Sequence, residues 1–261
     1  MAAKQIALTR RPAASLADGE RSFIGRAPID SVVARREHDA YCDWLTAKGV
    51  TVVCLTAEES MPDSVFIEDV AVVLPELAII TTPGAVSRRQ EPAQVVAALA
   101  RQRRCEHLPA AATLDGGDVL RVGRRVLVGI TARSNPAGHA ALRDLLLPLG
   151  YEVASIGVQG CLHLKTACTA LDDRCLIVNP GWVDAQQFAP LEAIAVHPLE
   201  SFAANVLRVG TTVGVNAAFP RTADRLRSRG YDVNKIHIAE FHKAEAGLTC
   251  LSLLFDDLSG C

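Results

Sequence analysis

The sequence carries almost no net charge, and this absence limits the partners that it can have. Its 261 residues include 27 Lys and Arg against 29 Asp and Glu, a formal net charge of −2 at pH 7. Binding to nucleic acid or to an acidic membrane surface needs a clustered excess of basic residues. We therefore expect neither partner, and a charged substrate must be met by local groups.

The sequence also lacks long apolar runs. No stretch approaches the roughly 18 consecutive apolar residues that span a bilayer, and residues 1–12 lack the apolar core of a secretory signal. We therefore expect a cytoplasmic protein. With 49% hydrophobic and 21% charged residues, the composition suits a globular fold with a substantial core.

The sequence also lacks the residue spacings typical of metal sites, because neither Cys-x-x-Cys nor His-Glu-x-x-His occurs. We expect no metal and no cofactor. In a reducing compartment the cysteines are expected to be free thiols, and most of them small buried apolar side chains. They are Cys42, Cys54, Cys105, Cys161, Cys168, Cys175, Cys250 and Cys261.

What the sequence does contain is a recurring unit of strand, turn, strand, polar loop and helix. Alternating Val, Ile and Leu between Gly, Pro and Asp predict the strands, and apolar periodicity predicts the helices. The predicted strands are 66–73, 77–81, 117–122, 126–129, 163–171, 175–178, 204–209 and 212–215, and the predicted helices are 91–101, 136–147, 184–191 and 221–229. A fifth run, 248–255, must pair with 5–8 if the units form a closed ring.

In such a ring, residues at the same place in each unit converge on the central axis. Those at the entry to each first strand are Glu68 and Asp69, the stretch Asp115-Gly-Gly-Asp118, His163, Asn205 and Cys250. A thiol nucleophile needs an imidazole beside it and a third group to orient that imidazole. Taken singly, Cys250 could be a core thiol and His163 a core histidine, so only their equivalent positions favour a catalytic role.

Six segments, in order along the chain, together resemble the dimethylarginine dimethylaminohydrolases. They are PDSVFIED at 62–69, PGAVSRR at 83–89, LDGGDVL at 114–120, LHLKT at 162–166, AAN at 203–205 and GLTC at 247–250. That family belongs to the guanidino-group-modifying superfamily, the penteins. The resemblance runs from about residue 5 to residue 255 and implies an α/β fold, a five-bladed propeller with pseudo-fivefold repeats, in one catalytic domain over residues 1–261.

The resemblance also implies a catalytic triad. Cys250 falls on the family's nucleophile, His163 on its general acid and base, and Asp115 on the carboxylate that orients the histidine. The implied reaction converts N(omega)-methylated arginines, asymmetric dimethylarginine and monomethylarginine, to citrulline and dimethylamine or methylamine. It proceeds through a covalent thiouronium intermediate on Cys250.

Substrate-binding residues follow from the same resemblance. Asp63, Glu68 and Asp69 match acidic residues that hold the guanidinium, and Arg88 and Arg133 match arginines that hold the substrate carboxylate. The chemistry agrees, because a guanidinium only donates hydrogen bonds and an arginine fork fits a carboxylate. Acidic groups at one end and basic groups at the other specify a small guanidino amino acid.

The amine end of the substrate is where the sequence departs from the family. The backbone carbonyl of Ala244 matches a contact to the substrate amine, and residues 15–19 match the family's mobile lid. Glu20, however, stands where the family has leucine, and Glu245-Ala-Gly replaces an Asp-Gly pair. Both changes concern which guanidine is preferred.

Two other functions stay open at this point. One is an arginine deiminase-like or other guanidine hydrolase, which the lack of a large inserted helical domain disfavours. The other is a non-catalytic protein that binds arginine derivatives. The sequence allows a monomer or a homodimer.

Overall fold

The computed structural model of the chain describes residues 4–257. Its strands are β1 (Gln5–Arg10), β2 (Thr51–Leu55), β3 (Ala71–Val73), β4 (Ala78–Ile80), β5 (Cys105–His107), β6 (Val119–Val122), β7 (Arg125–Ile130), β8 (Glu152–Gly157), β9 (Cys168–Ala170), β10 (Cys175–Val178), β11 (Glu192–Ala195), β12 (Leu207–Val209), β13 (Thr212–Asn216), β14 (Asp232–Ile236) and β15 (Leu253–Asp256). Its α-helices are α1 (Ser31–Ala47), α2 (Pro92–Leu99), α3 (Pro136–Leu146), α4 (Leu164–Ala167), α5 (Pro220–Ser228) and α6 (Ala239–Lys243). Its 3-10 turns are η1 (Ala14–Asp18), η2 (Pro62–Val65), η3 (Ile67–Val70), η4 (Val86–Arg88), η5 (Gly116–Asp118), η6 (Leu147–Leu149), η7 (Ala185–Phe188) and η8 (Thr249–Leu251).

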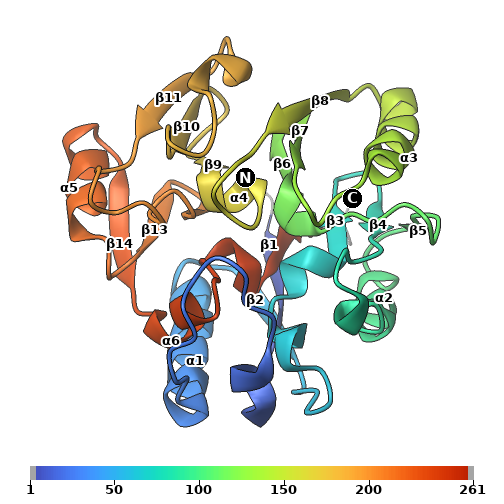
Figure 1. Cartoon of the computed structure of the whole chain (residues 1–261), viewed down its shortest axis with the longest axis horizontal. Helices are drawn as coiled ribbons and strands as arrows, with labels where there is room; N and C mark the ends of the chain where they lie inside the picture. The colour runs from blue at the N-terminus through green and yellow to red at the C-terminus, as the bar shows by residue number, and fades with distance from the viewer. Residues whose placement is uncertain (1–3, 258–261) are drawn as a thin grey trace.

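Within residues 4–257 the strands form five three-stranded sheets with one pattern. The sheets are β15-β1-β2, β3-β4-β5, β6-β7-β8, β9-β10-β11 and β12-β13-β14. In each sheet the middle strand is antiparallel to one neighbour and parallel to the other. Figure 1 shows the sheets around a common centre, with α1, α2, α3 and α5 on the outside. The predicted five-bladed α/β propeller is confirmed.

The ring closes where the two ends of the chain meet. Strand β1 is antiparallel to β15, with Gln5 opposite Asp256 and Leu8 opposite Leu253. This is the pairing that closure of the ring required. The first blade is therefore built from the beginning and the end of the sequence, which brings the 247–250 segment beside residues early in the chain.

In most blades the middle strand has the largest share of buried residues; the exception is the blade in which β6 is buried about as fully as β7. Strands β4, β10 and β13 are buried at every residue, whereas the third strands β2 and β5 have no buried residue. Continuous apolar runs such as Leu176-Ile-Val are typical of strands covered on both faces. The third strands and the long helix α1 were missing from the prediction. Several third strands are polar, as Cys105-Glu-His shows, and give no clear strand pattern.

The predicted helix over 184–191 is wrong. Only the turn η7 forms there, started by the carboxylate of Asp184, which accepts a hydrogen bond from the backbone N–H of Gln186. The turn ends at Phe188 because Pro190 disfavours a helical conformation at the residue before it. The other three predicted helices are present as α2, α3 and α5.

The cysteines are only partly as expected. All those within residues 4–257 are free thiols, but only Cys161, Cys168 and Cys175 are buried, so the expectation that most would be buried is wrong. Cys54 is exposed because it lies on the outer strand β2. Cys261 lies outside the described residues. In the part of the chain that the structure describes, no helix has the length and apolar character needed to cross a membrane.

Candidate active site

The residues predicted to converge lie on short turns, each directly before the first strand of a blade. Asp69 is in η3, Asp115 precedes η5, His163 precedes α4, and Cys250 is in η8. The sequence pattern predicted β-strands at most of these positions, and this part of the prediction is wrong. The turns end the sheet ladder, and this frees their side chains to face the centre rather than a sheet surface.

These turns surround one pocket. Most of the predicted site residues line it: Glu20, Asp63, Asp69, Arg88, Arg133, His163, Ala244 and Cys250. Asp115 is fully buried and lies behind His163, so it does not line the pocket. Glu68 lines a different cavity, of about 240 Å³.

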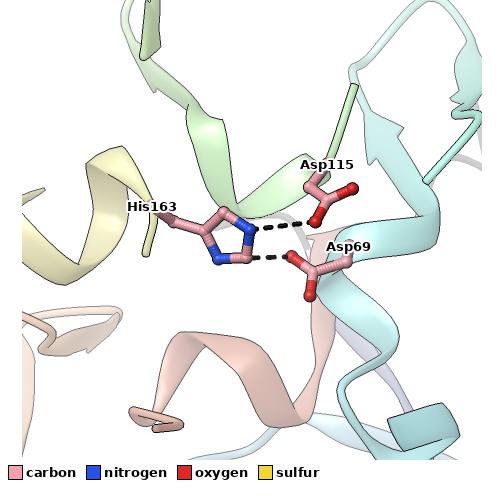
Figure 2. A group of neighbouring side chains, drawn as sticks. All are labelled: Asp69, Asp115 and His163. Atoms are coloured by element: carbon pink, nitrogen blue, oxygen red, sulfur yellow. Dashed lines mark hydrogen bonds and ion pairs between the residues drawn. The ribbon is translucent and has the colours of Figure 1, made fainter. Parts of the chain in front are cut away.

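Asp115 fixes the imidazole of His163. Its Oδ2 is 3.0 Å from Nε2 of His163, and its Oδ1 accepts a hydrogen bond of 2.8 Å from the backbone N–H of Gly84. Figure 2 shows the carboxylates of Asp115 and Asp69 both facing the imidazole ring. With no exposure to solvent, Asp115 is held in one orientation and determines the orientation of the ring.

Asp69 approaches the other ring nitrogen of His163. Its Oδ1 is 3.9 Å from Nδ1 of His163 and accepts a hydrogen bond of 3.0 Å from the backbone N–H of Gly117. A Cβ atom at Gly117 would lie 2.6 Å from Nδ1 of His163 and 2.7 Å from Oδ1 of Asp69. Only glycine fits there, so this position of the Gly-Gly pair allows the close approach of backbone and site.

The pocket holds the thiol neutral and the imidazole charged. Burial raises the pKa of Cys250 to about 12, and the charges of Glu68 and Asp69 act in the same direction. Burial lowers the pKa of His163, but Asp69 and the hydrogen bond to Asp115 outweigh it and raise that pKa to about 9. At neutral pH the ligand-free site therefore contains a thiol and an imidazolium, not a thiolate.

Asp69, Asp115 and His163 are also close enough to be considered as metal ligands. One ligand atom from each lies within 4.8 Å of the others, an arrangement that sequence spacing did not indicate. Their oxygens are already used, however. Both oxygens of each carboxylate accept hydrogen bonds or ion pairs, and the cation of Arg88 lies 2.5 Å from Asp69. This arrangement favours an orienting network over a metal site, although each oxygen can still accept a further N–H donor.

Arg88 is buried among acceptors. Its Nε and Nη2 donate to the carboxylate of Glu91, its Nη1 donates to Asp69, and its Nη2 also reaches the backbone carbonyl oxygens of Asp63 and Phe66. One N–H of Nη1 is left for a ligand. Arg133 differs, because its buried Nη1 makes no hydrogen bond among the described residues and has only a long ion pair, of 3.8 Å, with Oδ2 of Asp115. Arg133 is thus the freer cation for an anionic group.

Glu68 belongs to a second network, beside the turn η8 that carries Cys250. Its Oε1 pairs with Nζ of Lys165 at 2.5 Å, and its Oε2 accepts a hydrogen bond of 2.7 Å from the hydroxyl of Thr249. The side-chain amide of Asn205 donates to that hydroxyl and accepts from the backbone N–H of Thr249. Asn205 and Glu68 therefore hold the turn that carries Cys250.

Glu20 and Ala244 both line the pocket. The backbone N–H of Glu20 donates to Oδ2 of Asp63 at 3.0 Å, and its side chain accepts a hydrogen bond of 2.7 Å from Ser87. Ala244 ends α6 and is buried. The predicted lid residues form η1, and the loop after them continues across the pocket to the segment that follows α6.

Comparisons with known proteins identify the family. The family model for eukaryotic N,N dimethylarginine dimethylhydrolase matches residues 21–187. An N(G),N(G)-dimethylarginine dimethylaminohydrolase of Streptomyces coelicolor is 39% identical over 253 residues, 97% of each chain. The enzyme of that name from Pseudomonas aeruginosa is 33% identical over 251 residues, 95% of this chain and 98% of its own. The chain belongs to the dimethylarginine dimethylaminohydrolase family.

Solved structures agree. Dimethylarginine dimethylaminohydrolase of Pseudomonas aeruginosa, as a Cys-to-Ser mutant complexed with citrulline, matches with a TM-score of 0.92 at 32% identity, over 98% of this chain and 100% of that one. The N-terminal domain of ArgZ, a cyanobacterial arginine dihydrolase, has a TM-score of 0.86 at 21% identity, over 97% of this chain and 99% of that one. At 21% identity, the likeness to ArgZ shows a shared fold and nothing about activity. The predicted family is confirmed.

Three charged residues of this dimethylarginine dimethylaminohydrolase family member were not assigned a role from its sequence. Glu91 pairs with Arg88, and Lys165 pairs with Glu68. Glu245 accepts a hydrogen bond from the loop that follows Glu20. An acidic residue three positions after Arg88 was an available signal for Glu91. Lys165 gave no signal, and Glu245 was noted only as a departure from the family's Asp-Gly pair, because the partners of both are distant in the sequence.

Proposed function

We propose that the protein hydrolyses N(omega)-methylated arginines to citrulline and dimethylamine or methylamine. The observation that carries the proposal is one pocket in which Cys250 and a charged His163 lie beside the carboxylates of Asp63 and Asp69, in a chain of this family. A thiol, an acid and paired acceptors are what hydrolysis of a guanidinium requires.

Asp69 and Asp63 are proposed to bind the guanidinium. Burial by itself would raise the pKa of Asp69, but the charges of His163 and Arg88 outweigh it and lower that pKa to about 2. Burial raises the pKa of Asp63, and Arg88 opposes the rise. Asp69 is thus a permanent anion, whereas Asp63 gains most from a bound cation. Glu68 acts indirectly, since it holds Thr249 in the nucleophile turn.

The amino acid end of the substrate is proposed to lie between Arg133 and Ala244. Nη1 of Arg133, which makes no hydrogen bond among the described residues, suits the substrate carboxylate, and the remaining N–H of Arg88 can add one hydrogen bond. The carbonyl of Ala244 faces the amine, as the family resemblance implies. Glu20 adds another carboxylate to the lining of the pocket.

The first half of the proposed reaction forms a covalent intermediate. A guanidinium beside Asp69 offsets the negative charges that keep Cys250 protonated, so the thiol proton leaves to solvent and the thiolate attacks the guanidinium carbon. His163, already an imidazolium, donates its proton to the departing dimethylamine as the carbon–nitrogen bond breaks. The product is an S-alkylthiouronium on Cys250.

The second half releases citrulline. His163 is now neutral and accepts a proton from a water molecule, whose oxygen attacks the thiouronium carbon. The carbon–sulfur bond breaks as the hydroxyl proton of the intermediate passes to the sulfur, so citrulline leaves and the thiol and imidazolium of the ligand-free site are restored. Asp115 keeps Nε2 of His163 in place through both proton transfers.

The direct test is to incubate the protein with asymmetric dimethylarginine, monomethylarginine and arginine, and to identify the released amine and citrulline. Dimethylamine and methylamine are the expected products. Ammonia from arginine alone would favour the deiminase alternative, and binding without turnover would favour the non-catalytic one. The variant Cys250→Ser should lose turnover but keep ligand affinity within about tenfold.

A further inference from the structure

Glu245, which lines the pocket, is bonded through one carboxylate oxygen to the loop that follows Glu20. Its Oε1 accepts hydrogen bonds from three consecutive backbone N–H groups, those of Ser22 at 2.6 Å, Phe23, and Ile24 at 2.6 Å. Successive N–H groups that converge in this way form an anion-binding nest. Glu245 has a φ of 63° and is 7% exposed. A non-glycine residue keeps this left-handed conformation only where its surroundings hold it.

We define residues 20–30 as the lid loop. Helix α6, which lies just before Glu245 in the sequence, holds the rest of this loop. Nζ of Lys243 donates a hydrogen bond of 3.1 Å to the carbonyl of Pro28, and Oε2 of Glu240 accepts one of 2.8 Å from the backbone N–H of Asp30. At its other end the lid loop is bonded to Asp63 and Ser87 through Glu20, so it crosses the pocket. Glu245 is its central anchor.

The second oxygen of Glu245 is left without a donor. Oε2 is buried and has no hydrogen-bond partner among the described residues. A buried carboxylate oxygen is costly unless a donor meets it. Glu245 lines the pocket and follows Ala244, the residue assigned to the substrate amine. An ammonium group supplies both the positive charge and the N–H donors that this oxygen lacks.

We propose that Glu245 determines specificity for α-amino guanidines: its Oε2 binds the ammonium group of the substrate while its Oε1 holds the lid loop over the pocket. The inference rests on the proposed function, because it takes the ligand to be an amino acid. Glu245 touches no reacting atom. Its charge links two events, recognition of the amine and closure of the lid loop, that would otherwise be independent.

The test compares asymmetric dimethylarginine with its analogue that lacks the α-amino group. Glu245→Gln should lower kcat/KM for asymmetric dimethylarginine by roughly 10- to 100-fold, mainly through KM, because it replaces a charge-assisted hydrogen bond by a neutral one. For the analogue, the same substitution should change kcat/KM by less than about threefold. Equal losses for both substrates would overturn the contact to the ammonium group.

Glu200→Gln is the matched control. Glu200 is 8% exposed and its carboxylate accepts backbone hydrogen bonds from Arg221 and Thr222, but it lies outside the pocket. This variant should leave the preference between the two substrates unchanged. Amide hydrogen exchange tests the lid: the N–H groups of residues 22–24 should exchange faster in Glu245→Gln than in Glu200→Gln. Equal exchange in the two variants would overturn the role of Oε1.

Ligand binding separates this inference from the proposed function. Calorimetry on Cys250→Ser, with and without Glu245→Gln, measures the affinity for both ligands without turnover. A wild-type protein that releases no amine contradicts the proposed function, yet a tenfold or greater loss of affinity confined to asymmetric dimethylarginine still supports Glu245. If neither ligand binds, both ideas fail.

Discussion

Cys250, the proposed nucleophile, should become a thiolate in a substantial fraction of molecules only when a guanidinium occupies the pocket. Burial and two carboxylates raise the pKa of Cys250 to about 12, so about one molecule in 10⁵ carries the thiolate at pH 7. A unit positive charge about 4 Å from the sulfur, at an effective dielectric constant of about 20, contributes about 4 kcal/mol. That energy raises the thiolate population at fixed pH about a thousandfold.

The assay is the ultraviolet absorbance of the thiolate, followed as the pH is raised. Subtracting the titration curve of Cys250→Ser removes the absorbance of the other cysteines. The titration is then repeated with a saturating guanidine that is not hydrolysed. The midpoint should move to lower pH. A neutral urea of the same shape is the control, because it fills the pocket without charge and should leave the midpoint in place or move it upward. An unchanged midpoint with the guanidine would refute the reasoning.

Three further predictions concern the charged groups around His163 and Arg88. Asp115→Asn should lower the pKa of His163 from about 9 and reduce kcat at least about 100-fold, checked by an NMR titration of the imidazole and by steady-state kinetics. Glu91→Gln should destabilise the fold by about 3 kcal/mol, because Arg88 is left buried with one fewer anion; urea unfolding measures this. Since the folded-state pKa of His163 is raised, its stabilising effect is complete below about pH 6.5 and is lost as the pH rises through about 9. A denaturation series should show this loss in the wild type and not in His163→Gln.

The ring could be predicted from the sequence because local and global signals agree in the middle strands. Runs such as Val126-Leu-Val and Cys175-Leu-Ile-Val are apolar at consecutive positions and are bounded by turns. Ring closure between 5–8 and 248–255 then followed from the need to pair the last strand. The outer strands could not be found in this way, because a strand such as Asp232–Ile236 is held by its neighbour and exposes polar side chains.

The site was predictable to the extent that it depends on position in the repeat. Equivalent positions indicated Asp69, His163 and Cys250, and these residues do line one pocket. Glu68 was placed beside Asp69 because the two are adjacent in sequence. In a turn, however, adjacent side chains point in different directions, and Glu68 faces Lys165 in another cavity.

Partners across the ring could not be predicted. The bond from Glu245 to residues 22–24 joins positions more than 200 residues apart, and it depends on a positive φ that no residue type signalled. Arg88 is a similar case: its identity suggested a free cation for a ligand, but Glu91 and Asp69 take most of its donors. Electrostatic pairing of this kind is determined by the tertiary structure.

The whole-chain charge of −2 hides the property on which the proposed mechanism depends. Asp69 has one charge that acts on two groups in opposite ways: it stabilises the imidazolium of His163 and it destabilises the thiolate of Cys250. Without a ligand, His163 is therefore already protonated and can act as the proposed acid, whereas Cys250 is still a neutral thiol. A guanidinium at Asp69 reverses the second effect where the reacting carbon arrives. A neutral ligand leaves the thiol protonated, so discrimination between guanidines and ureas, including the product citrulline, follows from charge as well as from shape.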